Sequence, residues 1–371
     1  MDQNLSTTFS IASKIKVCYI SSGRELFSEG VGHLFKDDQD SLGALLALQK
    51  NNPNIELALI ILDDDPKQLN PKILNRFIRS KINLKFVPSC TWAKPISHYQ
   101  KIHKDLTLAK EAKKLAKIHY ELKILDLLRQ NQIDIIISDS YVRLFGKTIL
   151  GNLESISYNR NGNSNNNSIH TKNKINIPDL SYGGLVFNIH PADTSINPGI
   201  SPTQDALFRQ RLFFRINSKQ NFVTIDNKKY YKIELFENKK ATFKENELKA
   251  AQRIFSKYKD CFVEQINEKW YLFVPTNCPR GIFSAKTGAT FHFIDHGIDT
   301  GKKISFSNST PIRRGDSEQS LRNRNYETKN IVLTRGLLMV LKDEQVQKNI
   351  LSNKIKNLFY KQFMQPLHIT Q

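Results

Sequence analysis

The sequence has no long hydrophobic run, no closely spaced cysteine pair and no leader pattern, and each absence excludes a class of protein. No stretch approaches the roughly 18 apolar residues of a membrane span. The start, MDQNLSTTFSIASK, lacks a basic segment followed by an apolar core, so we expect no secretory signal. The four cysteines form no C-x-x-C pair, which is typical of a reduced cytoplasmic protein without a cysteine metal site. We predict a cytoplasmic protein with no membrane partner and leave its oligomeric state open.

Acidic residues are scarce relative to basic ones. The chain has 35 Asp plus Glu against 55 Lys plus Arg, a formal charge of +20. Such an excess can attract nucleic acid or other polyanions. The basic residues are scattered, however, and no patch interleaves them with aromatic side chains. We favour a general coating of the surface with lysine, while nucleic acid stays open as a possible but not favoured partner.

Strand-like and helix-like segments alternate through the first half of the 371 residues. Short β-branched runs predict strands at 15–22, 55–62, 82–89 and 133–140. Helical spacing predicts helices at 40–50, 71–81 and 103–130. This alternation favours an α/β fold: a Rossmann-like, mostly parallel sheet with helices on both faces.

The second half departs from this alternation. The polar stretch NRNGNSNNNS (159–168) predicts a surface loop. Strand patterns with a charged helix between them predict an inserted α+β subdomain over 222–274, and a basic helical C-terminal extension is predicted over 311–371. The Rossmann-like core is then expected in two parts, 1–221 and 275–310.

A polar pair ends the apolar strand GGLVFNIHP (183–191). Asn188 and His190 are two residues apart, so their side chains point to the same side of the strand. An open α/β sheet keeps its ligand crevice at the carboxyl ends of its strands. The pair equally fits a capping asparagine beside a satisfied core histidine, so by itself it leaves both interpretations open.

The segment FHFIDHGIDTG (291–301) is a second apolar strand that ends in polar residues. Its loop holds two aspartates, Asp295 and Asp299, and two glycines. Asp and Gly are favoured in ordinary turns, so this loop alone indicates no more than a turn.

In combination, N-I-H-P and the downstream D-x-G-[ILV]-D-[TG]-G resemble the folate-dependent formyltransferase family. That family includes glycinamide ribonucleotide transformylase and the catalytic domain of methionyl-tRNA formyltransferase. The stretch IDIIISDSYVRLF (133–145) resembles the strand that leads into the family's folate-binding loop. The resemblance extends over residues 15–305, interrupted by the polar loop and the insertion, and implies an enzyme that uses 10-formyltetrahydrofolate as co-substrate.

The resemblance implies roles for particular residues. The family's catalytic asparagine, histidine and aspartate fall on Asn188, His190 and Asp299, and a histidine that many members carry falls on His292, with a supporting role. Its folate-contacting positions fall on Tyr141, Val142, Arg143, Leu144, Ile294, Asp295 and Gly297. Asp295 is expected to shape the folate loop, and no metal is implied.

These residue types suit direct formyl transfer through a tetrahedral intermediate. The amide of Asn188 and a protonated His190 can stabilise the oxyanion that forms when an amine attacks the formyl carbon. A carboxylate such as Asp299 can keep a neighbouring imidazole charged, and through a water it can help remove the amine's extra proton. Such a transfer needs neither a metal nor a nucleophilic serine or cysteine.

Two differences from the family's sequence pattern concern the amine that accepts the formyl group. After the first strand, SSGRELFSEGVGH (21–33) has too few glycines for a good phosphate loop, which disfavours a phosphorylated ribose. The family's S-L-L-P-type turn is replaced by ADTSINPGISPTQDAL (192–207). We therefore expect a primary amine of a small metabolite, a sugar amine or an amino-acid derivative, recognised by 192–203 and the insertion.

Two alternatives remain. A protein like methionyl-tRNA formyltransferase, or an RNA-binding protein on the same scaffold, would explain the charge, although the tRNA enzyme has a β-barrel where helices are predicted here. A nucleotide-cofactor enzyme is suggested by the acidic run Asp63 to Asp65. It is remote, because the first strand lacks a G-x-G-x-x-G turn.

Overall fold

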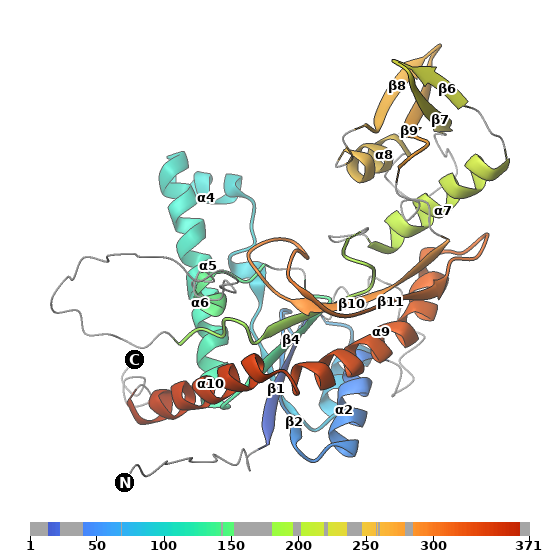
Figure 1. The fold of residues 1–371 in the computed structure, drawn as a ribbon. Coiled ribbons are helices and arrows are strands. Elements are labelled where there is room, and N and C mark those ends of the chain that lie inside the picture. Colours follow the sequence, from blue (N-terminus) through green and yellow to red (C-terminus); the bar gives the residue numbers. More distant parts are fainter. Residues whose placement is uncertain are drawn as a thin grey trace, which may run out of the picture. The chain divides into compact units, whose positions relative to one another are not determined.

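The computed structural model describes most of the chain (Figure 1). The described residues are 14–22, 40–67, 69–141, 144–151, 180–195, 202–218, 222–235, 247–256, 258, 260–278 and 285–363. The polar loop predicted at 159–168 lies outside them, as do 23–39 and 196–201. Within the described ranges, no helix combines the length and the hydropathy that a membrane span requires.

Seven strands form one sheet in the order β11-β10-β5-β4-β1-β2-β3. Their bounds are β1 Ile15–Ser21, β2 Ile55–Leu62, β3 Asn83–Phe86, β4 Ile135–Asp139, β5 Val186–His190, β10 Lys286–Phe293 and β11 Lys303–Pro311. β1 pairs in parallel with β2 and with β4, and β2 with β3, whereas β10 and β11 are antiparallel. The predicted Rossmann-like, mostly parallel α/β fold is confirmed.

The chain divides into two compact units. The first comprises Met1–Asn188, Phe293–Gly297 and Leu337–Gln371, and the second Ile189–His292 and Ile298–Gly336. The division therefore falls within β5 and at the end of β10.

The core of the first unit consists of β1, β2 and β4, whose side chains are almost continuously apolar and buried, as expected for parallel strands covered on both faces. The helical segments of this unit are α2 Ser41–Asn51, α3 Pro71–Arg79, η2 Ser89–Thr91, α4 Ile96–His103, α5 Leu106–Gln130, α6 Lys147–Leu150 and α10 Glu344–Phe363. Short polar side chains cap the starts of three of them, because they accept hydrogen bonds from backbone N–H groups that lack a helical partner. These caps are Asp40 on α2, Asn70 on α3 and Asp105 on α5.

The helix predicted over 103–130 is confirmed as α5, which begins at Leu106, and the short helix α4 before it was not predicted. α4 ends at His103, and Lys104 adopts the left-handed backbone conformation with φ 59°. The side chain of Asp105 then accepts a hydrogen bond from the backbone N–H of Leu108 (2.8 Å) and starts α5. Lys104 and Asp105 therefore separate the two helices, and the N-cap Asp105 determines where the predicted helix begins.

Within the first unit, a buried arginine links α10 to α5. The guanidinium of Arg129 donates hydrogen bonds to Oδ1 of Asn353 (2.6 Å) and of Asn357 (2.7 Å), both on α10. It also donates to the backbone oxygen of Leu180 and lies 4.1 Å from the ring centre of Tyr182. The basic C-terminal helix is thus joined to α5 through neutral amides.

The second unit contains a small antiparallel sheet in the order β6-β7-β9-β8 (Figure 1). The elements are α7 Pro202–Ser218, β6 Phe222–Ile225, β7 Lys228–Leu235, α8 Glu247–Phe255, β8 Phe262–Ile266, β9 Lys269–Pro275 and α9 Glu318–Val340. Side chains of α7, α8, β7 and β9 share one apolar core. The sequence indicated β6, β7, α8 and β9 and missed β8, whose side chains are mostly exposed.

Two further elements of the second unit were not predicted. α7 begins inside 192–203, which was interpreted as a loop, and β11 occupies the end of the predicted core part 275–310 and the first residue of the helical extension. β11 has little apolar character because its inward side chains are polar. The hydroxyl of Thr310, for example, donates to Oδ1 of Asn325 on α9 (2.8 Å) and lies 2.7 Å from the hydroxyl of Thr328.

Candidate functional site

β5 carries Asn188 and His190 on one side. Ile189 between them is buried, as the alternation of a strand requires. Asn188 is half-buried and His190 is 5% exposed. The pair thus occupies the last positions of a strand that Pro191 follows immediately.

Asp299 lies between two histidines of the second unit. Its Oδ2 is 3.4 Å from Nδ1 of His190, and its Oδ1 is 3.4 Å from Nε2 of His292. The side chains of all three residues are nearly inaccessible to solvent, with exposed fractions of 6%, 2% and 11% for His190, His292 and Asp299. The two carboxylate oxygens therefore each face one imidazole in a protected environment, where electrostatic interactions are stronger than in water.

The backbone of Asp299 explains how its carboxylate reaches this place. Its φ of +54° lies in the left-handed region, which most side chains avoid and aspartate tolerates. The turn after β10 therefore reverses the chain at Asp299 before β11 begins.

His292 takes a more central place than the sequence suggested. It is 2% exposed and lies near the end of β10, opposite Lys303 on β11. Its distance to Asp299 equals that of His190. A histidine expected only to support the site thus contacts the carboxylate as closely as the histidine assigned to catalysis.

Buried polar residues hold the segment that leaves β5, and sequence reasoning missed them. The hydroxyl of Thr290 on β10 donates to the backbone oxygen of Ala192 (2.8 Å) and accepts from the N–H of Thr194 (3.4 Å). The amide of Asn325 donates to the backbone oxygen of Pro191 (2.9 Å). No local pattern marks either residue, because their partners lie 98 and 134 residues away.

Asp193 ties the unusual loop after His190 to β11. Its carboxylate pairs with the ammonium of Lys303 and accepts hydrogen bonds from Asn308 Nδ2 (3.0 Å) and from the N–H of Ser195 (2.9 Å). Burial alone would raise the pKa of Asp193, but these hydrogen bonds outweigh it and lower the pKa below its ordinary value. The loop after His190 therefore holds an anion, Asp193, whose partner cation is Lys303 on β11.

The first of the two stretches predicted to contact folate lies in the first unit. The phenol oxygens of Tyr141 and Tyr120 are 2.9 Å apart, and the ring of Tyr141 stacks on Phe145. Burial, followed by the neighbouring Tyr120, raises the pKa of Tyr141. Leu144 is exposed, and Val142 and Arg143 lie outside the described residues.

The second stretch begins where β10 ends. The N–H of Ile294 donates to the backbone oxygen of Val186 on β5 (2.9 Å). Oδ1 of Asp295 accepts a hydrogen bond from the N–H of Gly297 (3.0 Å), an arrangement that closes a local turn. That bond suits the loop-shaping role expected of Asp295, while contact of these residues with folate stays a prediction.

Comparison with known proteins identifies the fold. Neither a family model nor a curated protein matches the chain. Among solved structures, PvdF of pyoverdin biosynthesis, an N10-formyltetrahydrofolate-dependent formyltransferase, aligns with 89% of this chain and 99% of its own at a TM-score of 0.50 and 17% identity. The chain has the fold of a folate-dependent formyltransferase. The fold expected from the motifs is thereby confirmed, and at 17% identity the likeness concerns the fold alone.

Two further structures with this kind of activity in their names align more loosely. Phosphoribosylglycinamide formyltransferase from Bacillus Halodurans aligns at a TM-score of 0.44 and 17% identity, over 89% of this chain and 96% of that one. Glycinamide ribonucleotide transformylase 1 from Symbiobacterium toebii aligns at 0.43 and 12% identity, over 87% and 86%.

Proposed function

We propose that this formyltransferase fold is an active N-formyltransferase, which moves a formyl group from 10-formyltetrahydrofolate to a primary amine of a small metabolite. The observation that carries the proposal is the carboxylate of Asp299 between His190 and His292, with Asn188 two residues before His190 on β5. The fold that the chain shares with the folate-dependent PvdF supports the choice of formyl donor.

In this proposal each side chain has a defined task. The co-substrate supplies the formyl carbon, the acceptor nitrogen forms the new bond to it, and the bond to the folate nitrogen breaks. Asn188 donates a hydrogen bond to the formyl oxygen, and His190, oriented by Asp299 at its Nδ1, donates a second one as that oxygen gains negative charge. Asp299, through a water, takes part in removing the proton that the amine loses, and the departing folate nitrogen takes up a proton, so that tetrahydrofolate is released.

The acceptor is proposed to be a sugar amine or an amino-acid derivative. Asp193, in the segment after His190, and its partner Lys303 on β11 supply the fixed charges for its recognition. We assign the core of the transferase to 1–221 and 275–310, acceptor recognition to the insertion 222–274 together with the loop after His190, and a supporting role to the extension 311–371.

The test is a turnover assay with 10-formyltetrahydrofolate and a panel of sugar amines and amino-acid derivatives, read by release of tetrahydrofolate and by mass spectrometry of the formylated amine. His190→Ala and Asp299→Asn should each lower kcat by about 10² or more, as expected when oxyanion stabilisation is lost. His103→Ala, which changes an exposed histidine of α4, is the matched control and should keep the parental rate. Parental turnover in both site variants, or no formylated product from any amine, would overturn the proposal.

A further inference from the structure

A cavity of about 480 Å³ lies in the first unit between the end of β3 and helix α5. Phe86 and Pro88 contribute from the end of β3 and the residues after it, and Tyr120 and Leu127 contribute from α5. The volume is within the range of small-ligand sites, about 300 to 1,000 Å³. The function proposed above makes no use of this cavity.

The charged groups around the cavity favour an anion. Lys123 and His119 are exposed on α5, and among the described residues neither has an ion-pair or hydrogen-bond partner. The acidic residue of the lining, Asp126, is already engaged: its carboxylate accepts from the hydroxyl of Tyr360 and from Nε2 of Gln130 (3.0 Å). The ammonium of Lys123 is therefore available to a ligand, whereas the carboxylate of Asp126 is held by Tyr360 and Gln130.

The uncharged lining favours a flat apolar body. Phe86, Pro88 and Leu127 are half-buried, and the ring of Tyr120 is 4% exposed. Aromatic and proline faces bind planar rings well, because the contact area is large and few rotamers are lost. A ring can pack against these residues while an acidic substituent reaches Lys123.

We infer that this cavity is a binding site for a small aromatic anion, with its ring against Phe86, Pro88 and Tyr120 and its carboxylate or sulfonate on Lys123. The site belongs to one unit and does not depend on formyl transfer.

Trp92 offers a local reporter for this site. Its ring centre lies 5.9 Å from that of Tyr120. The other tryptophan of the chain, Trp270, lies on β9 in the second unit. Replacing Trp270 by Phe therefore leaves a single tryptophan, whose ring lies next to Tyr120 of the cavity lining.

The experiment titrates 1-anilinonaphthalene-8-sulfonate, whose flat apolar naphthalene carries one sulfonate, into the full-length Trp270→Phe protein. We expect saturable binding with energy transfer from Trp92. Lys123→Glu should raise the dissociation constant about tenfold or more. Lys110→Glu makes the same charge change on an exposed lysine of α5 outside the cavity and should alter it less than twofold. Ala116→Phe, which narrows the cavity, should weaken binding as Lys123→Glu does.

Thermal unfolding followed by circular dichroism accompanies each variant, and Lys123→Gln replaces Lys123→Glu if the latter unfolds early. Equal effects of Lys123→Glu and Lys110→Glu would overturn the inference, because the anionic probe would then be attracted by the positive charge of the protein in general and not by Lys123. Binding without energy transfer from Trp92, or binding unchanged by both Lys123→Glu and Ala116→Phe, would also overturn it. None of these results depends on whether the chain transfers a formyl group.

Discussion

The side-chain amide of Asn325 donates a hydrogen bond to the backbone oxygen of Pro191, which precedes it by 134 residues (2.9 Å). The same nitrogen donates to the backbone oxygen of Gly288 (2.7 Å), and Oδ1 accepts from the hydroxyl of Thr310 (2.8 Å). Asn325 is buried. One amide on α9 thus fixes the residue that follows His190 together with β10 and β11.

Replacing Asn325 by Ala should therefore affect both stability and turnover. The change leaves two buried carbonyl oxygens without this donor, and we expect the free energy of unfolding to fall by about 2 to 4 kcal/mol. Because Pro191 would lose its anchor, kcat of the proposed transfer should fall about tenfold while KM changes little. Urea unfolding and the turnover assay measure the two effects. Asn323→Ala, on the same helix and hydrogen-bonded to Gln319, is the control and should cost under about 1 kcal/mol; an equal effect of both variants would refute the positioning role.

His292 allows a second test, because it shares Asp299 with His190. If His292 positions the carboxylate, His292→Ala should lower kcat about tenfold, clearly less than His190→Ala, and should alter the dependence of kcat on pH. His292→Gln retains an N–H donor and should recover part of the rate. A loss as large as that of His190→Ala would instead make His292 a catalytic residue, and an unchanged pH profile would deny it any influence on Asp299.

The sequence predicted the regular, locally determined parts of this molecule. β1, β2 and β4 are buried on both faces, so their residue types alone identify them. α7 and β11 were missed, since α7 follows a loop-like stretch and β11 turns hydroxyl groups inward toward α9. For these elements, contacts between distant segments outweigh local pattern.

In the candidate site too, local sequence pattern predicted some features, and others depend on contacts between distant segments. The period of two along a strand placed Asn188 and His190 on one side, and only the resemblance to a family singled out Asp299. The close approach of His292 to Asp299 depends on the left-handed turn after β10. The roles of Asn325 and Thr290 depend on hydrogen bonds across about a hundred residues or more, which no local pattern encodes.

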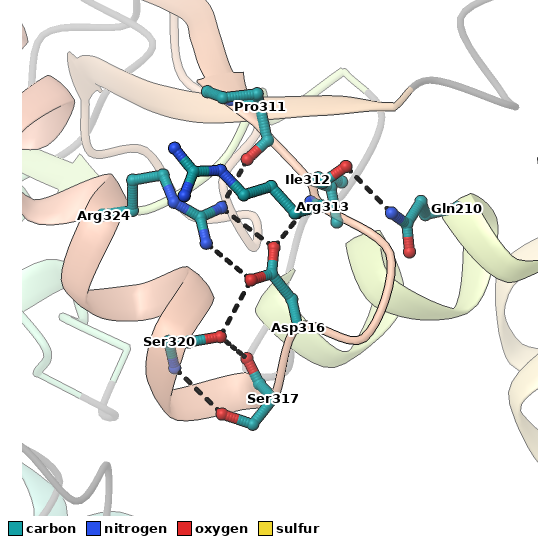
Figure 2. Close-up of polar contacts among 8 residues, drawn as sticks. All are labelled: Gln210, Pro311, Ile312, Arg313, Asp316, Ser317, Ser320 and Arg324. Atoms are coloured by element: carbon teal, nitrogen blue, oxygen red, sulfur yellow. Dashed lines mark hydrogen bonds and ion pairs between the residues drawn. The ribbon is translucent and has the colours of Figure 1, made fainter.

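The start of α9 predicts an acid-sensitive contribution to stability. Figure 2 shows the carboxylate of Asp316 receiving two hydrogen bonds from Arg324 and others from the N–H of Arg313 and the hydroxyl of Ser320. The Arg324 guanidinium, aided by the other donors, outweighs burial and lowers the pKa of Asp316 to about 2. A carboxyl whose pKa is lowered by folding stabilises the protein above its ordinary titration range and loses that contribution as the pH falls toward 2.

Asp316→Asn should accordingly lower the free energy of unfolding at neutral pH by about 1 kcal/mol, a modest figure because the network borders solvent. Between about pH 4 and pH 2 the variant should lose less stability than the parent. Urea unfolding across this pH range provides the measurement, with Asp226→Asn in the exposed turn between β6 and β7 as control. A parallel pH dependence in parent and Asp316→Asn would contradict the assignment.

Gly336 on α9 faces the ring of Phe291 on β10 at a distance that leaves no room for a side chain. A Cβ atom at position 336 would lie 2.3 Å from Cδ1 and 2.8 Å from Cγ of Phe291. The ring of Phe291 is fully buried, so it has no open space into which to move. Because Phe291 precedes His292, a displaced ring would also disturb the strand that carries this histidine.

Gly336→Ala should therefore destabilise the protein by about 1 to 3 kcal/mol, although the same change in an open helix position gains about 1 kcal/mol. Phe291→Leu alone should also destabilise it by leaving a cavity, but the double variant should be more stable than the sum of the two single effects predicts, because the smaller leucine makes room for the new methyl group. Urea unfolding of the four proteins completes this double-mutant cycle. If Gly336→Ala stabilises the protein, or if the two effects simply add, α9 does not pack against β10 at this point.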